Sequence, residues 1–147
     1  MNPRYPCGSR TKFFDAMHKI KVETTAAREI VDVTPAVTRV LRESGAMKGV
    51  CHLFVPHTTA GITINENTDP NVRRDMLQAL ERMVPASAEY QHAEGNSAAH
   101  ILASLVGSST LAFVENGKLV LGAWQAIYLC EFDGPRTRTV LIRVLPE

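Results

Sequence analysis

The chain has 147 residues, 45% of them hydrophobic, which is enough for a single domain with its own core. Its 16 Lys and Arg residues are matched by 15 Asp and Glu residues, and a net charge of +1 attracts neither nucleic acid nor an anionic membrane surface. Three widely spaced cysteines, Cys7, Cys51 and Cys130, indicate reduced thiols rather than a disulfide framework or a CxxC metal site. No apolar run is long enough to cross a membrane, so we expect a cytoplasmic protein without nucleic-acid or membrane partners.

The first 15 residues lack the hydrophobic periodicity found in the following segments. Residues 1–15 contain two prolines, a glycine and little periodicity, so we expect a flexible N-terminal extension and a single domain over 16–147. Over 18–24 apolar and polar residues alternate, which is typical of a half-buried strand.

A helix and two strands are expected next. Residues 32–45 predict a helix with Thr34 as N-cap, because a proline follows that threonine and Gly45 is placed to end the helix. The segments 49–56 and 61–66 predict strands on either side of a short turn.

Two further helices carry apolar stripes. The first opens at Asp69, an N-cap followed by proline, and the second is expected over 97–106 with Gly107 just past its end. The expected buried residues are Val72, Met76, Leu80 and Met83 or Val84 on the first helix, and Ile101, Leu102 and Leu105 on the second.

The C-terminal third of the chain predicts strands. Asn116-Gly117 is the strongest short signal for a hairpin within 111–122, and strands follow at 124–132 and 137–145. In the first of these strands Trp124, Tyr128 and Phe132 share one face and are expected in the core. The order of elements is not a regular βαβ alternation, so we expect an α+β domain, a largely antiparallel sheet or sandwich with about three helices.

The segment 57–75 holds the first candidate site residues. Its hydroxyl, amide and carboxyl side chains are more numerous than a connection between strands needs. Thr58, Thr59, Asn67 and Asp69 are equally compatible with roles in turns and caps. His57 and Glu66 have no such local role and are candidates for function.

The second candidate group surrounds the third predicted helix. Asn96, His100 and Ser104 recur every four residues and so share a helix face, with His92 just before the helix start. Together with His57, these histidines predict contact with a metal ion or a phosphate. Ser108 and Ser109 follow the helix and could contact phosphate oxygens, although the dipole at a helix C-terminus repels anions.

The third candidate group surrounds Glu131. Its neighbours on the same strand face are apolar, so this carboxylate must be paired, protonated or a ligand. Arg136 and Arg138, across the next turn, are the expected ion-pair partners. Arg136 could instead hold a phosphate with two hydrogen bonds.

Taken in chain order, these blocks resemble the YjbQ-like family, often labelled secondary thiamine-phosphate synthase. The resemblance covers roughly 18–145 and rests on HTTAGITINENTDPNVRRDM, on H-x3-N-x3-H followed by ILASLVGSS, and on GKLVLGAWQAIYLCEFDGPRTRTV. The matching positions are His57, Thr58, Thr59, Asn65, Glu66, Asp69, His92, Asn96, His100, Glu131 and Arg136.

The resemblance implies a homotrimer whose pockets lie near subunit boundaries and hold a metal ion or an anion. The implied activity joins a pyrimidine diphosphate to a thiazole phosphate and releases diphosphate. On this basis we expect a divalent metal ion, zinc or magnesium, at His57, His92 and His100. The expected catalytic residues are Glu131, His57 and Glu66, and the expected phosphate ligands are Asn96, Arg136, Ser108 and Ser109.

Two other functions use the same residues. One is a non-catalytic trimer that binds a metal or a phosphorylated metabolite, and the other is a metal-dependent phosphate-ester hydrolase. The chain is too short for the (β/α)8 barrel expected of an ordinary thiamine-phosphate synthase.

Overall fold

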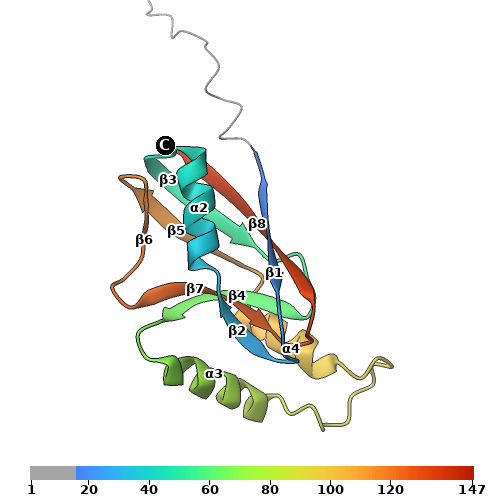
Figure 1. Ribbon diagram of the computed structural model, residues 1–147. Helices are drawn as coiled ribbons and strands as arrows, with labels where there is room; N and C mark the ends of the chain where they lie inside the picture. Colours follow the sequence, from blue (N-terminus) through green and yellow to red (C-terminus); the bar gives the residue numbers. More distant parts are fainter. Residues whose placement is uncertain (1–15) are drawn as a thin grey trace, which may run out of the picture.

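The computed structural model describes residues 16–147, so Cys7 and the predicted extension over 1–15 lie outside the described residues. Within this range the chain forms three helices and two antiparallel sheets (Figure 1), which confirms the predicted α+β class. None of these helices is both long enough and apolar enough to span a membrane.

The larger sheet has five strands in the order β1-β8-β3-β5-β6. Its strands are β1 (His18–Glu23), β3 (Lys48–Phe54), β5 (Ser109–Glu115), β6 (Lys118–Val120) and β8 (Thr137–Pro146). The predicted hairpin joins β5 to β6, and its turn residues Asn116 and Gly117 have φ of 52° and 72°. Asparagine and glycine tolerate this left-handed conformation, which a two-residue hairpin turn requires.

The smaller sheet has the order β2-β7-β4 and contains a strand that the sequence did not predict. Its strands are β2 (Glu29–Asp32), β4 (Ala60–Glu66) and β7 (Gln125–Glu131). The sequence of β2 is only EIVD, too short for a periodic pattern, and its strand conformation depends on antiparallel pairing with β7.

The three helices are α2 (Thr34–Ser44), α3 (Pro70–Met83) and α4 (Ser97–Val106). Asp69 is the N-cap of α3, as predicted, and its carboxylate accepts the Asn71 N–H at 2.8 Å. The prediction of Thr34 as the N-cap of α2 was wrong, because Thr34 is the first residue of the helix and Val33 occupies the N-cap position. The Asp32 carboxylate accepts the Thr34 N–H. The Thr34 hydroxyl oxygen instead accepts the Ile127 N–H at 2.8 Å and so ties α2 to β7.

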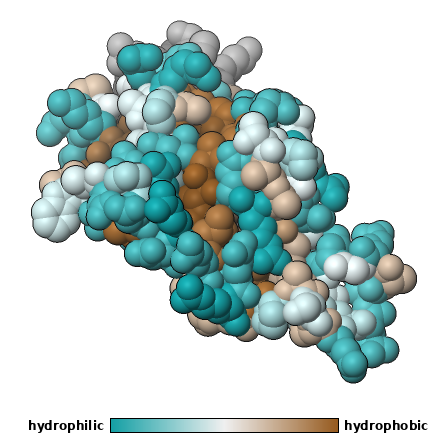
Figure 2. Space-filling view, turned by 60° about the horizontal axis from the view of Figure 1, so that its bottom comes forward, coloured by the Kyte–Doolittle hydropathy of each residue, from teal (hydrophilic) through white to brown (hydrophobic). Residues whose placement is uncertain are grey.

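Two apolar clusters form the core, one on each face of the smaller sheet. The larger cluster lies between the two sheets and α2, with Leu41, Leu53, Ile127 and Ile142 fully buried. The second cluster packs α3 and α4 against the opposite face of the smaller sheet, as the position of α3 in Figure 1 indicates. In Figure 2 a strip of hydrophobic residues runs between two hydrophilic regions on this face of the molecule.

Several predicted core positions are exposed. Ile101 and Leu105 on α4 are 39% and 57% exposed, because the helix packs through Leu102 and a set of alanines instead. Trp124 is 67% exposed since it precedes β7, whereas Tyr128 and Phe132 are buried as predicted. The apolar residues of α3 are only partly buried, with Met83 exposed and Val84, just after the helix, buried.

The cysteines within the described range are thiols, as predicted. Cys51 and Cys130 are both buried and form no disulfide. Burial raises the pKa of Cys51 to about 11 and that of Cys130 to about 12, so neither is a thiolate at neutral pH.

A close approach between Gly61 of β4 and the end of α4 predicts a stability effect. A Cβ at Gly61 would lie 2.8 Å from the Gly107 carbonyl oxygen and 2.9 Å from Val106 Cγ1. Gly61→Ala should therefore lower the free energy of unfolding by about 1–3 kcal/mol in urea denaturation, because a backbone atom must move. Ser109→Ala, at an exposed position of β5, is the control, and equal stability of the two variants would contradict the prediction.

Candidate functional site

A polar pocket of about 340 Å³ lies where the loop before β4, the start of α4 and the β7–β8 turn meet. We call it the charged pocket. The loop contributes residues 56–59 to its lining. The other lining residues are Glu94, Asn96, His100, Asp133, Arg136 and Arg138.

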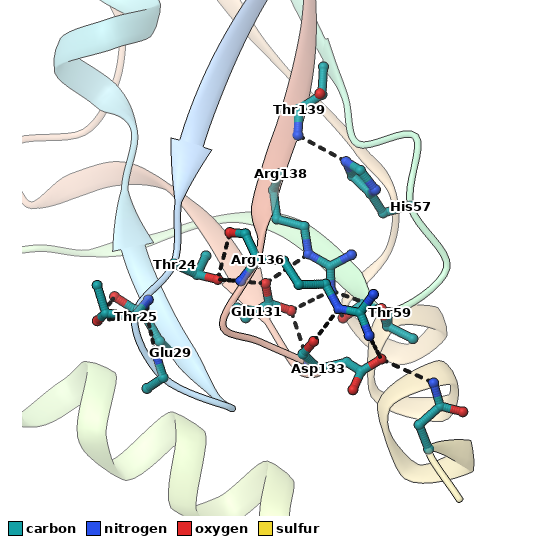
Figure 3. A network of polar contacts seen from close by, with 12 residues as sticks. Thr24, Thr25, Glu29, His57, Thr59, Glu131, Asp133, Arg136, Arg138 and Thr139 are labelled. Atoms are coloured by element: carbon teal, nitrogen blue, oxygen red, sulfur yellow. Dashed lines mark hydrogen bonds and ion pairs between the residues drawn. The ribbon is translucent and has the colours of Figure 1, made fainter. Parts of the chain in front are cut away.

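The floor of this pocket is built on a buried ion pair between Glu131 and Arg138. Glu131 is fully buried at the end of β7, and Arg138 is 4% exposed at the start of β8. Arg138 Nε donates to one Glu131 oxygen at 2.7 Å, and an Nη atom donates to the other (Figure 3). This two-point geometry is the one that best compensates two buried charges.

Further hydrogen bonds complete the network around this pair. Glu131 also accepts the Thr24 hydroxyl and the Asp133 N–H, each at 2.9 Å. Arg138 also donates to Thr59 Oγ1 at 2.8 Å. Burial by itself raises the pKa of Glu131, but the bonds from Arg138, Asp133 and Thr24 outweigh it and hold the pKa below the ordinary value of 4.5. Glu131 is therefore ionised, and both of its carboxylate oxygens accept hydrogen bonds from within the protein.

Arg136 pairs with a different acid from the one expected. The sequence offered Glu131 as a partner for either arginine, but Arg136 donates to the Asp133 side chain at 2.9 Å and to the Asp133 carbonyl at 2.6 Å. Asp133 also accepts the side-chain amide of Asn96 at 3.0 Å. The Arg136 side chain remains 55% exposed, so a ligand in the pocket can reach it.

Asn96 lies just before α4 and not on the helix face with His100 and Ser104. It occupies the N-cap position without capping the helix through its side chain. Its amide oxygen is buried and has no hydrogen-bond partner. An unpartnered buried acceptor favours a ligand that brings a hydrogen-bond donor to this point.

His57 is held by the backbone of β8. Its Nε2 accepts the Thr139 N–H at 2.9 Å, which requires a neutral ring with the proton on Nδ1 (Figure 3). Burial and the nearby charge of Arg138 lower the pKa of His57 from 6.5, with smaller contributions from Lys21 and Arg136, while Glu131 opposes them. His57 is thus uncharged at neutral pH.

The three histidines expected to bind a metal do not form a ligand set within one chain. His57 and His100 both line the charged pocket, but His92 lies outside it and packs edge-on against His100, with ring centroids 5.4 Å apart. Over residues 16–147 no three His, Cys, Asp or Glu side chains are arranged to hold a metal ion. We therefore assign no chemical step to a metal.

The other candidate residues are divided between this site and distant positions. Glu66 lies at the far end of β4, opposite Gln125, whereas Ala60 at the near end lies opposite Glu131. The strand rise places these ends about 20 Å apart, so Glu66 is not part of the charged pocket. Ser108 lines an adjacent pocket, which also borders His57, and Ser109 lines neither.

Sequence reasoning did not assign Thr24, Glu94 or Asp133 to the site, and it named Arg138 only as an ion-pair partner. A signal for Arg138 exists in β8, where positions 138, 140, 142 and 144 alternate with more exposed ones and the last three are apolar. Arg138 begins this buried face, just as Glu131 lies on a buried face of β7. Thr24 and Glu94 carry no such pattern.

This fold and pocket define a small α+β domain of two antiparallel sheets with a polar, histidine-containing site. The chain belongs to the YjbQ/UPF0047 family, since the family model "UPF0047 protein YjbQ-like" matches residues 18–147. UPF0047 protein YugU of Bacillus subtilis is 50% identical over 127 residues, 86% of this chain and 96% of that protein. UPF0047 protein MJ1081 of Methanocaldococcus jannaschii is 43% identical over 131 residues, 89% of this chain and 95% of that protein.

Solved structures agree with this membership. A YjbQ/UPF0047-family protein of Clostridium acetobutylicum superimposes with a TM-score of 0.85 at 49% identity, covering 87% of this chain and 99% of that one. A protein of Sulfolobus solfataricus, described as YbjQ-like and of unknown function, gives a TM-score of 0.86 at 35% identity, covering 90% of this chain and 97% of that one.

The buried ion pair predicts that its two residues act as a unit. Glu131→Gln should lower the free energy of unfolding by about 3–5 kcal/mol, because it leaves Arg138 buried without a counter-charge. The double variant Glu131→Leu/Arg138→Met should cost clearly less, since no unpaired charge remains. Urea denaturation of both variants measures this, and a cost for Glu131→Gln below about 1 kcal/mol would show that the pair is not coupled.

The pKa of His57 predicts a titration that NMR can follow. The ring should take up its proton below pH 6.5, so the neutral form that accepts the Thr139 N–H predominates at pH 7. Lys21→Met should raise the midpoint, because the charge of Lys21 lowers the pKa of His57, whereas Lys19→Met on the same strand serves as control. A midpoint above 6.5 in the unmodified protein would refute the assignment.

Proposed function

We propose that the charged pocket binds a phosphorylated small molecule and that the protein is a transferase that displaces diphosphate, as a thiamine-phosphate synthase does. The observation that carries this proposal is the convergence of Arg136, His57 and His100 from three separate segments on one pocket. Its volume, about 340 Å³, lies within the range of small-molecule sites.

The donors in the pocket suit phosphate oxygens. Arg136 binds Asp133 through Nε and one Nη atom, and the N–H groups that remain on its two Nη atoms can bind phosphate oxygens. The helix α4 begins at Ser97, directly after the pocket residue Asn96, so its partly positive N-terminal end lies beside the pocket. His57 and His100 add imidazole groups on the same side of the molecule.

The acceptors in the pocket suit a second part of the ligand. The carboxylates of Asp133 and Glu94 line the same space, and the unpartnered oxygen of Asn96 lies beside them. Asp133 is already paired with Arg136, but a bare anion brings no hydrogen-bond donor to the Asn96 oxygen. A ligand with a phosphate at one end and an amino group or cation-like centre at the other satisfies both sets, and an aminopyrimidine diphosphate has this character.

The proposed reaction places negative charge on the leaving group. The bond between the pyrimidine's carbon and the diphosphate oxygen breaks, its electron pair leaves with diphosphate, and the thiazole nitrogen forms the new bond to that carbon. Arg136 and the start of α4 stabilise the charge that grows on the diphosphate, and Asp133 holds the arginine in place. The neutral His57 contacts the substrate without adding a positive charge next to a cation-like carbon.

This proposal gives Glu131 and Glu66 different roles from the catalytic ones expected from the sequence. Glu131 is a positioning residue, because it does not line the pocket and its side chain is hydrogen-bonded to Thr24, Asp133 and Arg138. Glu66 has no role in this proposal, because it lies outside the charged pocket. The homotrimer remains a prediction, which light scattering in solution can test.

A non-catalytic binding protein and a phosphate-ester hydrolase remain the rival functions. Incubation of the purified protein with the pyrimidine diphosphate and the thiazole phosphate, together and separately, distinguishes the three. Thiamine phosphate formed only from the mixture supports the transferase, whereas inorganic phosphate released from either substrate alone supports the hydrolase. Binding of either compound without any product supports the binding protein.

Arg136 offers the sharpest mutational test of this function. Arg136→Gln should weaken the binding of inorganic diphosphate by about tenfold or more, since one charge-assisted interaction is lost. Arg143→Gln, at an exposed position of β8 outside the charged pocket, should leave binding unchanged. Calorimetric titration measures both, and equal affinities in the two variants would place the anion elsewhere.

A further inference from the structure

A second pocket also borders His57 and differs from the charged pocket in chemistry. Its volume is about 360 Å³, and its lining residues are His57, Ala60, Ala103, Ser104, Gly107 and Ser108. None of these carries a formal charge at neutral pH. We call it the neutral pocket. His57 borders both pockets, so the two spaces meet at this one ring.

The walls of the neutral pocket are held by backbone hydrogen bonds. The Gly107 carbonyl accepts the Ile62 N–H at 2.9 Å, and the Ser108 carbonyl accepts the Val55 N–H at 2.8 Å. The end of α4 is thereby fixed both to β4 and to the segment that follows β3. The pocket is a preformed part of the fold, which reduces the ordering cost of binding.

Close packing and backbone conformation account for the two glycines beside this pocket, but not for the two serines at its rim. Gly61 must be small because a Cβ there would meet the Gly107 carbonyl. Gly107 has open space around it, since a Cβ built on it meets nothing within 4 Å, but its φ of 97° is a backbone conformation that favours glycine. The serines at the rim, Ser104 and Ser108, are exposed, so larger side chains could be accommodated there without disturbing the core.

We infer that the neutral pocket is the subsite for the uncharged ring of the phosphorylated ligand, whose phosphate and amino group the charged pocket binds. This inference rests on the proposed function of the charged pocket. A flat ring fits a space with small walls and can pack against the imidazole of His57, which is uncharged at neutral pH. The serine hydroxyl of Ser108 supplies a hydrogen-bonding group at the edge. The neutral pocket thus selects among phosphorylated compounds by the size of their organic part.

The test compares two probes that share a phosphate and differ by a ring. Inorganic phosphate and phenyl phosphate are titrated calorimetrically into the full chain. We expect phenyl phosphate to bind more tightly by at least about tenfold, because the ring adds contacts that the bare anion lacks. Ser108→Leu and Ser104→Leu should each remove most of this preference while leaving the affinity for inorganic phosphate unchanged.

Ser109→Leu is the matched control, because Ser109 is adjacent, exposed and outside both pockets. It should retain the full preference for phenyl phosphate, and equal melting temperatures will show that all three variants are folded. A preference that survives in both Ser108→Leu and Ser104→Leu would overturn the inference. So would equal binding of the two probes to the unmodified protein, a result that leaves phosphate binding in the charged pocket intact. Failure of inorganic phosphate to bind at all would instead refute the proposed function, and this inference with it.

Discussion

The buried ion pair between Glu131 and Arg138 is the interaction on which the site depends. Two charges removed from water are costly unless each makes several well-placed hydrogen bonds. Glu131 receives them from Thr24 and Asp133 as well as from Arg138, and Arg138 reaches on to Thr59. One pair thereby connects the end of β1, the β7–β8 turn and the loop before β4.

The consequence of this connection is a fixed geometry around His57. Arg138 binds Thr59, and the next residue of β8, Thr139, binds His57 through its backbone. Two consecutive residues of one strand therefore hold both ends of the segment 57–59. The pair therefore sets the position of the ring, whereas its neutral state depends first on burial and then on the charge of Arg138, which Glu131 opposes.

The close approach of α4 to β4 places this helix beside both pockets that border His57. Gly61 allows the end of α4 to reach the strand, and the start of the same helix brings Asn96 and His100 into the charged pocket. One short helix therefore lines both pockets, with its N-terminal end facing the charged residues and its C-terminal end facing the neutral ones. This polarity matches the helix dipole, which favours an anion only at the start of α4.

The sequence by itself determined the strands with clear alternation, the Asn116-Gly117 hairpin and the Asp69 cap, because these depend on local patterns. It also identified four residues that line the charged pocket, namely His57, Asn96, His100 and Arg136. Only the tertiary structure decided that Arg138 rather than Arg136 pairs with Glu131, that Glu66 lies at the wrong end of β4, and that His92 lies outside the pocket. Periodicity states which face of a strand a residue occupies, but not which end of that strand meets another segment. That second fact depends on sheet register and helix packing, which arise from contacts between residues far apart in the chain.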